Sequence, residues 1–210
     1  MNKRVVAVVL AAGKAERMGR LKQLLPFGQK TVLETVVDTL LATSVAEILV
    51  VLGHRAEDVQ AVLSGRNVSS TVNPNYEKGM FSSVLCGLDT LPQDADGMMM
   101  LLGDQPQIRA SVVNAVLDRF QVTDKGIVIP EVQGHRGHPV IIDIHRYGPA
   151  IRSLDGAEGL KPVVRGFPDD TEIVRLDDES ILRDMDTPED YERELRLREI
   201  DDKRDEWLRK

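Results

Sequence analysis

Three short segments carry the residues whose types and spacing could do chemistry. The first opens with apolar and small residues at the end of an apolar run: Leu10, Ala11, Ala12 and Gly13. Small residues let a ligand lie close to the backbone, whose N–H groups can hold phosphate oxygens. Arg17 and Lys22 follow and could stabilise the charge of a phosphate displacement. The spacing of Gly13, Gly19 and Lys22 fits neither a Walker A loop nor a dinucleotide fingerprint, and a glycine-rich surface loop is the alternative.

The other two segments place carboxylates where a cation could bind. Asp104 ends an apolar run in the sequence G-D-Q-P at 103–106, and Asp184 and Asp186 alternate in D-M-D-T-P at 184–188. Carboxylates at the ends of extended segments can hold a metal or a substrate hydroxyl. The alternatives are a turn-forming aspartate at 104 and a plain helix N-cap at 186 or 187.

A basic loop lies later in the chain. His135, Arg136 and His138 fall within Q-G-H-R-G-H-P at 133–139, where a bound phosphate compound or solvent could face them. Two histidines three apart could suggest zinc, but no thiolate or third histidine is nearby, and we do not expect a zinc site.

Strand and helix patterns alternate along the elements that must position these segments. Strands are expected at 4–10, 48–52, 68–72, 98–102, 126–130, 138–144 and 173–176, the first two of them buried. Helical periodicity is expected at 31–41, 56–63, 82–91, 111–120, 146–165 with interruptions, and from Pro188 onward. This alternation predicts an α/β fold with a mainly parallel sheet and helices on both faces. Ligands of such sheets gather at the carboxyl ends of the strands, where the informative loops fall.

Composition sets outer limits on function. The chain has 210 residues and a net charge of -7, which argues against sequence-independent binding of nucleic acid. The single cysteine, Cys86, excludes an internal disulfide and fits a reducing compartment, so we expect a cytoplasmic protein. The apolar start, 5–12, is read as a strand rather than a signal peptide, and no apolar run is long enough to span a membrane.

Together these motifs resemble the molybdopterin nucleotidyltransferases. The resemblance rests on L-A-A-G-x-x-x-R-M-G-x-x-K at 10–22 with Q-L-L-P after it, and on G-D-Q-P, G-H-P and D-M-D-T-P-E-D in the same order. It covers about Val5 to Tyr191. Ala12 resembles the molybdenum cofactor cytidylyltransferase branch, since the guanylyl branch usually has a second glycine at the position before Gly13. The G-H-P at 137–139 is also similar to the cytidylyl branch.

The resemblance implies a three-layer α/β/α Rossmann-like fold of the nucleotide-diphospho-sugar transferase type. It implies a single domain, 1–210, with a nucleotide-binding part at about 1–130 and an acceptor-binding part at about 131–191. A charged C-terminal helix at about 188–210 completes it. The expected reaction transfers CMP from CTP to molybdopterin or its molybdenum form, with release of pyrophosphate.

The resemblance also implies roles for individual residues. Arg17, Lys22 and Asp104 would be catalytic, and Asp104 and Asp186 would hold Mg²⁺. The nucleotide would contact Leu10, Ala11, Ala12, Gly13, Arg17, Lys22, Asn73, Gly79, Ser82, Ser83 and Asp104. The acceptor would contact Gly137, His138, Pro139 and Lys161.

One departure from the branch bears on the acceptor. At 156–161 the chain has G-A-E-G-L-K, where the branch often carries G-D-x-G-x-R, so Ala157 lacks an acid and Lys161 lacks the bidentate fork of arginine. Guanylyl transfer, or transfer to a sugar or alditol phosphate, therefore stays open. A non-catalytic protein that delivers the cofactor is a further alternative. A molybdoenzyme or its maturation chaperone is a candidate partner.

Overall fold

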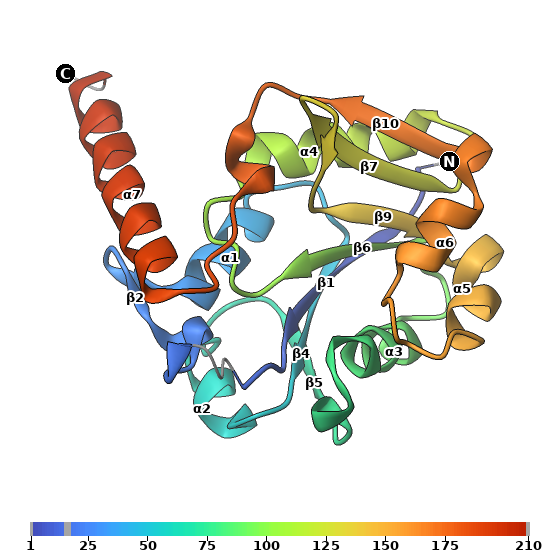
Figure 1. The fold of residues 1–210 in the computed structure, drawn as a ribbon, viewed down its shortest axis with the longest axis horizontal. Coiled ribbons are helices and arrows are strands. Elements are labelled where there is room, and N and C mark those ends of the chain that lie inside the picture. The colour runs from blue at the N-terminus through green and yellow to red at the C-terminus, as the bar shows by residue number, and fades with distance from the viewer. Residues whose placement is uncertain (1, 15–17, 209–210) are drawn as a thin grey trace.

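One sheet runs through most of the computed structural model, which describes residues 2–14 and 18–208 (Figure 1). Its strands follow the order β10-β7-β9-β6-β1-β4-β5, and the short β8 pairs with β7. Their bounds are β1 Val5–Ala11, β4 Glu47–Leu52, β5 Ser69–Val72, β6 Gly97–Leu102, β7 Ile127–Val132, β8 His135–Arg136, β9 Val140–Asp143 and β10 Thr171–Arg175. All seven expected strands are present, and a two-stranded hairpin, β2 (Pro26–Phe27) with β3 (Lys30–Thr31), lies outside the sheet.

The sheet is mainly parallel, as predicted. β1 pairs in parallel with β4 and β6, β4 with β5, and β10 with β7. The exception is β9, which runs antiparallel to both of its neighbours, β6 and β7. β9 therefore joins the strands of the first half of the chain to β7 and β10.

Helices cover both faces of the sheet, which gives the three layers. The helices are α1 Val32–Leu41, α2 Ala56–Ala61, α3 Met80–Thr90, α4 Ala110–Val122, α5 Ile144–Arg152, α6 Lys161–Gly166 and α7 Pro188–Leu208. Short 3-10 turns lie at Lys22–Leu24, Tyr76–Lys78, Pro168–Asp170 and Glu179–Leu182. α1, α2 and α4 pack on one face, and α3, α5 and α6 pack on the other. The helical stretch expected at 146–165 is two helices, because Gly156 and Gly159 adopt positive φ angles between them.

Alternation along β1 explains how one strand serves both cores. Val5, Ala7 and Val9 belong to the core beneath α1 and α4, whereas Val6 and Val8 belong to the core beneath α3. Every residue of β1 is buried. Full burial of a valine or leucine side chain stabilises the folded state by about 1.5–3 kcal/mol. The strand therefore holds the start of the loop that follows it in place.

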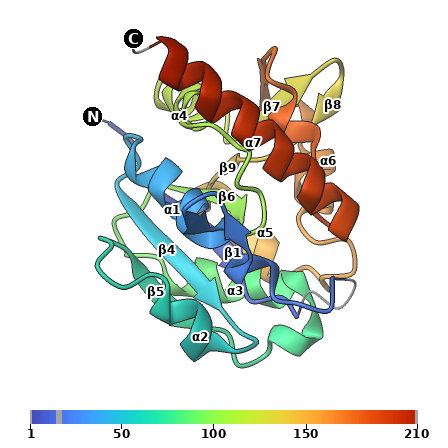
Figure 2. The ribbon, with the colours of Figure 1, turned by 90° about the vertical axis from the view of Figure 1, so that its left-hand side faces the viewer.

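Two helices begin with reciprocal side-chain caps. At α1, Thr31 and Glu34 form the expected capping box. Thr187 and Asp190 form a similar pair at the start of α7, since the backbone N–H of each donates to the other's side chain, at 3.1 and 3.2 Å. α7 crosses one side of the molecule (Figure 2), and its C-terminal end extends beyond the body (Figure 1). No helix in the described part of the chain is long and apolar enough to cross a membrane.

Candidate nucleotidyl-transfer site

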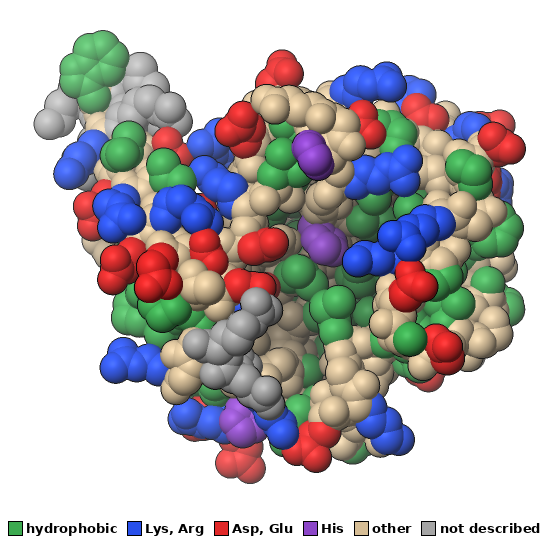
Figure 3. Space-filling model, in the orientation of Figure 1, with side chains coloured by type: hydrophobic (Ala, Val, Ile, Leu, Met, Phe, Trp, Pro, Cys, Tyr) green, Lys and Arg blue, Asp and Glu red, His purple; other side chains and the backbone are tan. Residues whose placement is uncertain are grey.

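The loops after β1 and β6 border a cavity of about 650 Å³. It is lined by Leu10, Ala12, Gly13, Lys14, Lys22, Gln23, Tyr76, Glu77, Gly79, Met80, Ser83, Leu102, Asp104 and Asp186. Figure 3 shows a hollowed face with acidic side chains on one side of the hollow and lysine or arginine on the other. The cavity has the size of a small-molecule site.

A close backbone approach places Asp104 beside the loop after β1. A Cβ on Gly103 would lie 3.0 Å from the Cβ of Ala11 and 3.0 Å from the carbonyl oxygen of Leu10. The N–H of Gly103 donates to that same carbonyl at 2.9 Å. A side chain here would be tightly packed against β1, which gives the glycine of the G-D-Q-P motif a physical role.

Lys22 joins the two carboxylates expected to hold a metal. Its ammonium Nζ lies 3.1 Å from Asp104 Oδ2 and 2.6 Å from Asp186 Oδ1, and the residue is only 7% exposed. Burial by itself would lower the pKa of Lys22, but the hydrogen bonds and charges of Asp186 and Asp104 outweigh it and raise the pKa. Lys22 is therefore a cation at neutral pH.

Side chains of the D-M-D segment at 184–186 alternate in direction, which orients its two aspartates. Met185 is 1% exposed and packs with Leu25, Phe27 and Val32 of the hairpin region. Successive side chains of an extended segment point to opposite sides, so burial of Met185 turns its two neighbours toward the cavities. The helix cap is Thr187, which leaves Asp186 available to Lys22.

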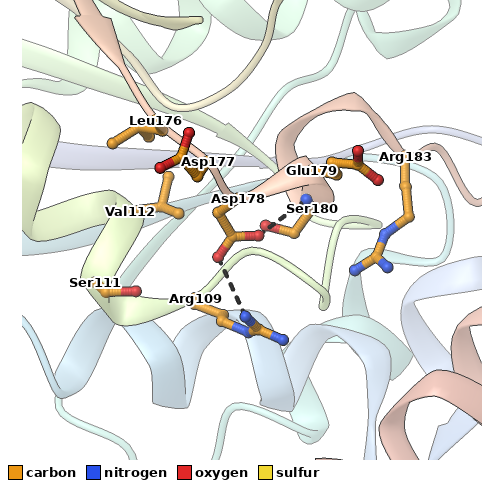
Figure 4. A pocket seen from close by; sticks show the side chains of 9 residues that line it. All are labelled: Arg109, Ser111, Val112, Leu176, Asp177, Asp178, Glu179, Ser180 and Arg183. Carbon is orange, nitrogen blue, oxygen red and sulfur yellow. Dashed lines mark hydrogen bonds and ion pairs between the residues drawn. The ribbon is translucent and has the colours of Figure 1, made fainter. Parts of the chain in front are cut away.

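A framework of polar contacts holds the chain just before this segment. Gln107 donates to the carbonyl of Arg183, and Arg193 of α7 donates to the carbonyl of Asp184 at 3.1 Å. The Arg183 side chain lies 3.5 Å from Glu194, which is 1% exposed. Figure 4 shows the neighbouring pocket, in which Asp178 accepts from Arg109 and from the backbone of Ser180. The acids at 184 and 186 therefore sit on a fixed segment.

The residues expected to contact the nucleotide divide into two groups. Leu10, Ala12, Gly13, Lys22, Gly79, Ser83 and Asp104 line the cavity, whereas Ala11, Asn73 and Ser82 are not among the lining residues. Asn73 Nδ2 donates to Ser82 at 2.8 Å and to Ser83 at 3.0 Å, and its Oδ1 accepts from the N–H of Asn75. These bonds fasten the β5 loop to α3, and a nucleotide contact of Asn73 stays a prediction. Arg17 lies outside the described residues.

Sequence reasoning missed several lining residues. Tyr76 and Met80 come from the turn and helix after β5, and Gln23 follows Lys22. The ring of Tyr76 lies 6.0 Å from that of His54 and 5.8 Å from Lys14 Nζ. The position of this turn at the carboxyl end of a strand was the available signal for Tyr76, because ligands gather there.

A second cavity, of about 840 Å³, adjoins the first and shares Met80 with it. Its lining includes the apolar side chains Met100, Ile129, Val140, Leu160, Val164, Ile181 and Leu182. The polar lining is Gln105, His135, Arg136, His138, Glu158, Lys161, Arg165 and Asp184. Of the expected acceptor residues, Gly137, His138 and Lys161 line this cavity, and Pro139 is buried outside its lining.

His138 and Gly137 have distinct physical settings at this cavity. Burial lowers the pKa of His138, although the charges of Asp184 and Asp104 act in the opposite direction. The imidazole is therefore neutral at pH 7. A Cβ on Gly137 would lie 2.3 Å from the carbonyl oxygen of Ile181, so the backbones pack too closely for any other residue.

The donor set suits a hard cation with substrate oxygens as further ligands. Asp104 and Asp186 supply carboxylate oxygens, and the Lys22 ammonium between them shows that a positive charge is accommodated there. Across residues 2–14 and 18–208, no three histidine, cysteine, aspartate or glutamate side chains form a metal cluster. Mg²⁺ commonly uses one or two carboxylates with water and phosphate, so the residues fit it better than zinc.

Comparison with known proteins agrees with this arrangement. Residues 7–174 match the family described as the MobA-like NTP transferase domain. The chain belongs to this family. It is therefore a nucleotidyltransferase-family enzyme, and the sequence resemblance is confirmed at that level.

Relatives in this MobA-like family differ in their named activities. The chain is 30% identical over 198 residues to nicotine blue oxidoreductase of Paenarthrobacter nicotinovorans, covering 91% of this chain and 96% of the relative. It is 24% identical to the molybdenum cofactor cytidylyltransferase of Escherichia coli K12, covering 88% and 92%. Rv0371c of Mycobacterium tuberculosis H37Rv superimposes with a TM-score of 0.81 at 27% identity, covering 93% of this chain and 100% of that structure. The manganese complex of Rv0371c gives 0.78 at 26% identity with the same coverage.

Met185→Ala should lower the free energy of unfolding by about 2–5 kcal/mol, because it removes a buried side chain and leaves a cavity. Urea unfolding measures the change. Ile200→Ala is the control, since Ile200 is 60% exposed and its loss should change stability by less than about 0.5 kcal/mol. Equal effects of the two substitutions would contradict the anchoring role of Met185.

His138 should make the protein less stable as the pH falls below 6.5. Its pKa in the folded protein is below the ordinary value of 6.5, so the unfolded chain binds more protons in that range and the free energy of unfolding decreases. The decrease between pH 7 and 5.5 should be smaller in His138→Gln, whereas the exposed neighbour change His135→Gln should leave it as in the wild type. If the free energy of unfolding had the same pH dependence in wild type and His138→Gln, the lowered pKa of His138 would be contradicted.

Proposed function

We propose that this protein transfers CMP from CTP to a phosphorylated pterin, molybdopterin or its molybdenum form, and releases pyrophosphate in the cytoplasm. The observation that carries the proposal is the convergence of Lys22, Asp104 and Asp186 beside two adjoining cavities. One cavity suits a nucleotide and the other suits its acceptor. The named activity of the E. coli relative supports the choice of nucleotide and acceptor.

The reaction needs no covalent enzyme intermediate. A terminal phosphate oxygen of the acceptor attacks the α-phosphorus of CTP, and the bond from that phosphorus to the bridging oxygen of the β-phosphate breaks. The bonding pair leaves with pyrophosphate, and a new phosphoanhydride links CMP to the acceptor. A phosphate monoester is already ionised near pH 7, so catalysis consists mainly of positioning and charge stabilisation.

Lys22 and Arg17 would hold the triphosphate, and Asp104 and Asp186 would hold Mg²⁺. When bound, the metal would neutralise charge on the phosphates. The manganese complex of Rv0371c supports the use of a divalent cation in proteins of this kind. Gly13 has open space where a Cβ would lie, which supports close approach of the nucleotide to its backbone.

The second cavity has the mixed lining that a phosphorylated heterocycle needs. Its walls combine aliphatic and thioether side chains with an equal number of polar ones, among which Arg136, Lys161 and Arg165 are cationic. Apolar walls pack against a planar ring, and cations bind phosphate. Lys161 provides charge without a bidentate fork, so a lone phosphate oxygen suits it better than a paired contact.

A release assay tests this proposal against its alternatives. Pyrophosphate release is measured for the four nucleoside triphosphates, each with a phosphorylated pterin, a sugar phosphate or an alditol phosphate. CTP with the pterin should be fastest. Pyrophosphate release only with GTP, or only with a sugar phosphate, would revise the proposed substrates but leave nucleotidyl transfer as the reaction. Absence of release in every combination would favour a delivery protein, and redox turnover of a dye without release would favour an activity like that named for the P. nicotinovorans relative.

Asp104→Ala should remove most turnover and leave the fold intact. The substitution takes away a carboxylate that contacts Lys22 and lines the nucleotide cavity, and it opens no hole in the core. Steady-state pyrophosphate release measures activity, and thermal unfolding measures the fold. Turnover at the wild-type rate in Mg²⁺ would contradict the assignment of Asp104.

Ala12→Gly should weaken the preference for CTP over GTP only in part. A Cβ on Gly53 would lie 2.7 Å from the Ala12 methyl and 2.7 Å from Tyr76, so Ala12 belongs to a crowded wall of the cavity. One methyl group discriminates by about 1–3 kcal/mol. The ratio of kcat/KM for CTP and GTP with the pterin acceptor measures the change, and a wild-type ratio that favours GTP would overturn the cytidylyl assignment.

A further inference from the structure

Lys22 takes up the two carboxylates that a divalent cation would use. Its Nζ contacts Asp186 at 2.6 Å and Asp104 at 3.1 Å, and its side chain is 9% exposed. A nearly buried ammonium is stable only when it is paired, because removal from water is costly. Moving Lys22 away from these acids is therefore unfavourable unless another anion receives it.

A divalent cation and the ammonium compete for the same two carboxylates, each of which gives one oxygen to Lys22. The two acids supply the carboxylates at this place, and the described residues contain no three-residue metal cluster to offer instead. Two like charges at one carboxylate pair repel each other strongly in a partly buried setting. We therefore expect a metal on both carboxylates to disfavour the position that Lys22 occupies here.

The anion that could receive Lys22 is a polyphosphate. Lys22 lines the nucleotide cavity together with Gly13, whose backbone faces open space. A triphosphate in this cavity would offer oxygens to the ammonium as the acids are released. Binding of the nucleotide would then favour binding of the metal, and the reverse.

We propose that Lys22 keeps Asp104 and Asp186 closed to divalent cations until a nucleoside triphosphate arrives, so that metal and nucleotide bind with positive cooperativity. The proposal rests on the proposed function, because it takes a triphosphate as the ligand of the first cavity. Lys22 is then a positioning residue for the metal as well as a ligand of the phosphates.

A purely structural role for the ion pairs is less well supported. The segment that carries Asp186 is already fixed on both sides, by the burial of Met185 and by the cap between Thr187 and Asp190. Asp104 is fixed by the close approach of Gly103 to β1. The three charges are therefore not needed to bring these segments together.

The test measures binding of Mn²⁺ by electron paramagnetic resonance, with and without a CTP analogue whose α,β-bridging oxygen is a methylene group. Wild-type protein should bind Mn²⁺ weakly alone and about 5–150-fold more tightly with the analogue, the usual range of coupling between sites. The contribution of Mn²⁺ binding by the analogue itself is subtracted from a protein-free titration. By reciprocity, Mn²⁺ should tighten binding of the analogue by the same factor.

Lys22→Met should reverse the pattern. Without the ammonium, Mn²⁺ should bind the free protein at least about tenfold more tightly than it binds wild type, and the gain from the analogue should shrink. Lys30→Met is the matched control, because it removes the same charge from a lysine that pairs with Asp38 on α1. This control should behave as wild type in both titrations.

Two results would overturn the proposal. One is Mn²⁺ affinity in wild type that does not change with the analogue, which needs no variant and so does not depend on whether Lys22→Met folds. The other is a folded Lys22→Met protein that binds Mn²⁺ alone no more tightly than wild type does. Failure of the proposed function is distinct: it would appear as absence of pyrophosphate release while the coupling of Mn²⁺ and analogue persists.

Discussion

Three segments that are far apart in the chain meet at the ammonium group of Lys22. Asp104 arrives from the end of β6 and Asp186 from the approach to α7, and both carboxylates contact this one nitrogen. A charge cluster in a partly buried place is stable only if each segment is held independently, since a loose carboxylate would turn to solvent. The glycine packed against β1, the buried Met185 and the cap at Thr187 meet that requirement. The surrounding fold can be understood as the support for these three charges.

Much of the fold could be predicted from the sequence because short runs of apolar and β-branched residues alternate with helical periodicity. All seven expected strands are present, and five of the six expected helical stretches fall within a few residues of the helices observed. The direction of β9 could not be read, because a run of apolar residues looks the same in either orientation. The β2–β3 hairpin has only two residues in each strand, too few for any periodicity.

The candidate site was predictable where its chemistry needs particular residue types. The small residues after β1, the acid after β6 and the acids around Met185 stand out in sequence, and the structure brings them to one end of the sheet. Sequence could not reveal that Asn73 bonds to Ser82 and Ser83, since an amide at a strand end serves a ligand or a neighbour equally well. Gln23 belongs to the Q-L-L-P part of the motif and Tyr76 follows a strand end, but neither signal assigned the residue to the cavity that the structure shows it lining.

The flexible side chain of Met80 lines both cavities and so lies where the two proposed binding sites meet. In the proposed reaction two molecules enter and are joined into one elongated product that occupies both places. Such a product keeps the contacts of each half, and holding one half keeps the other at high local concentration. It should therefore depart more slowly than either substrate.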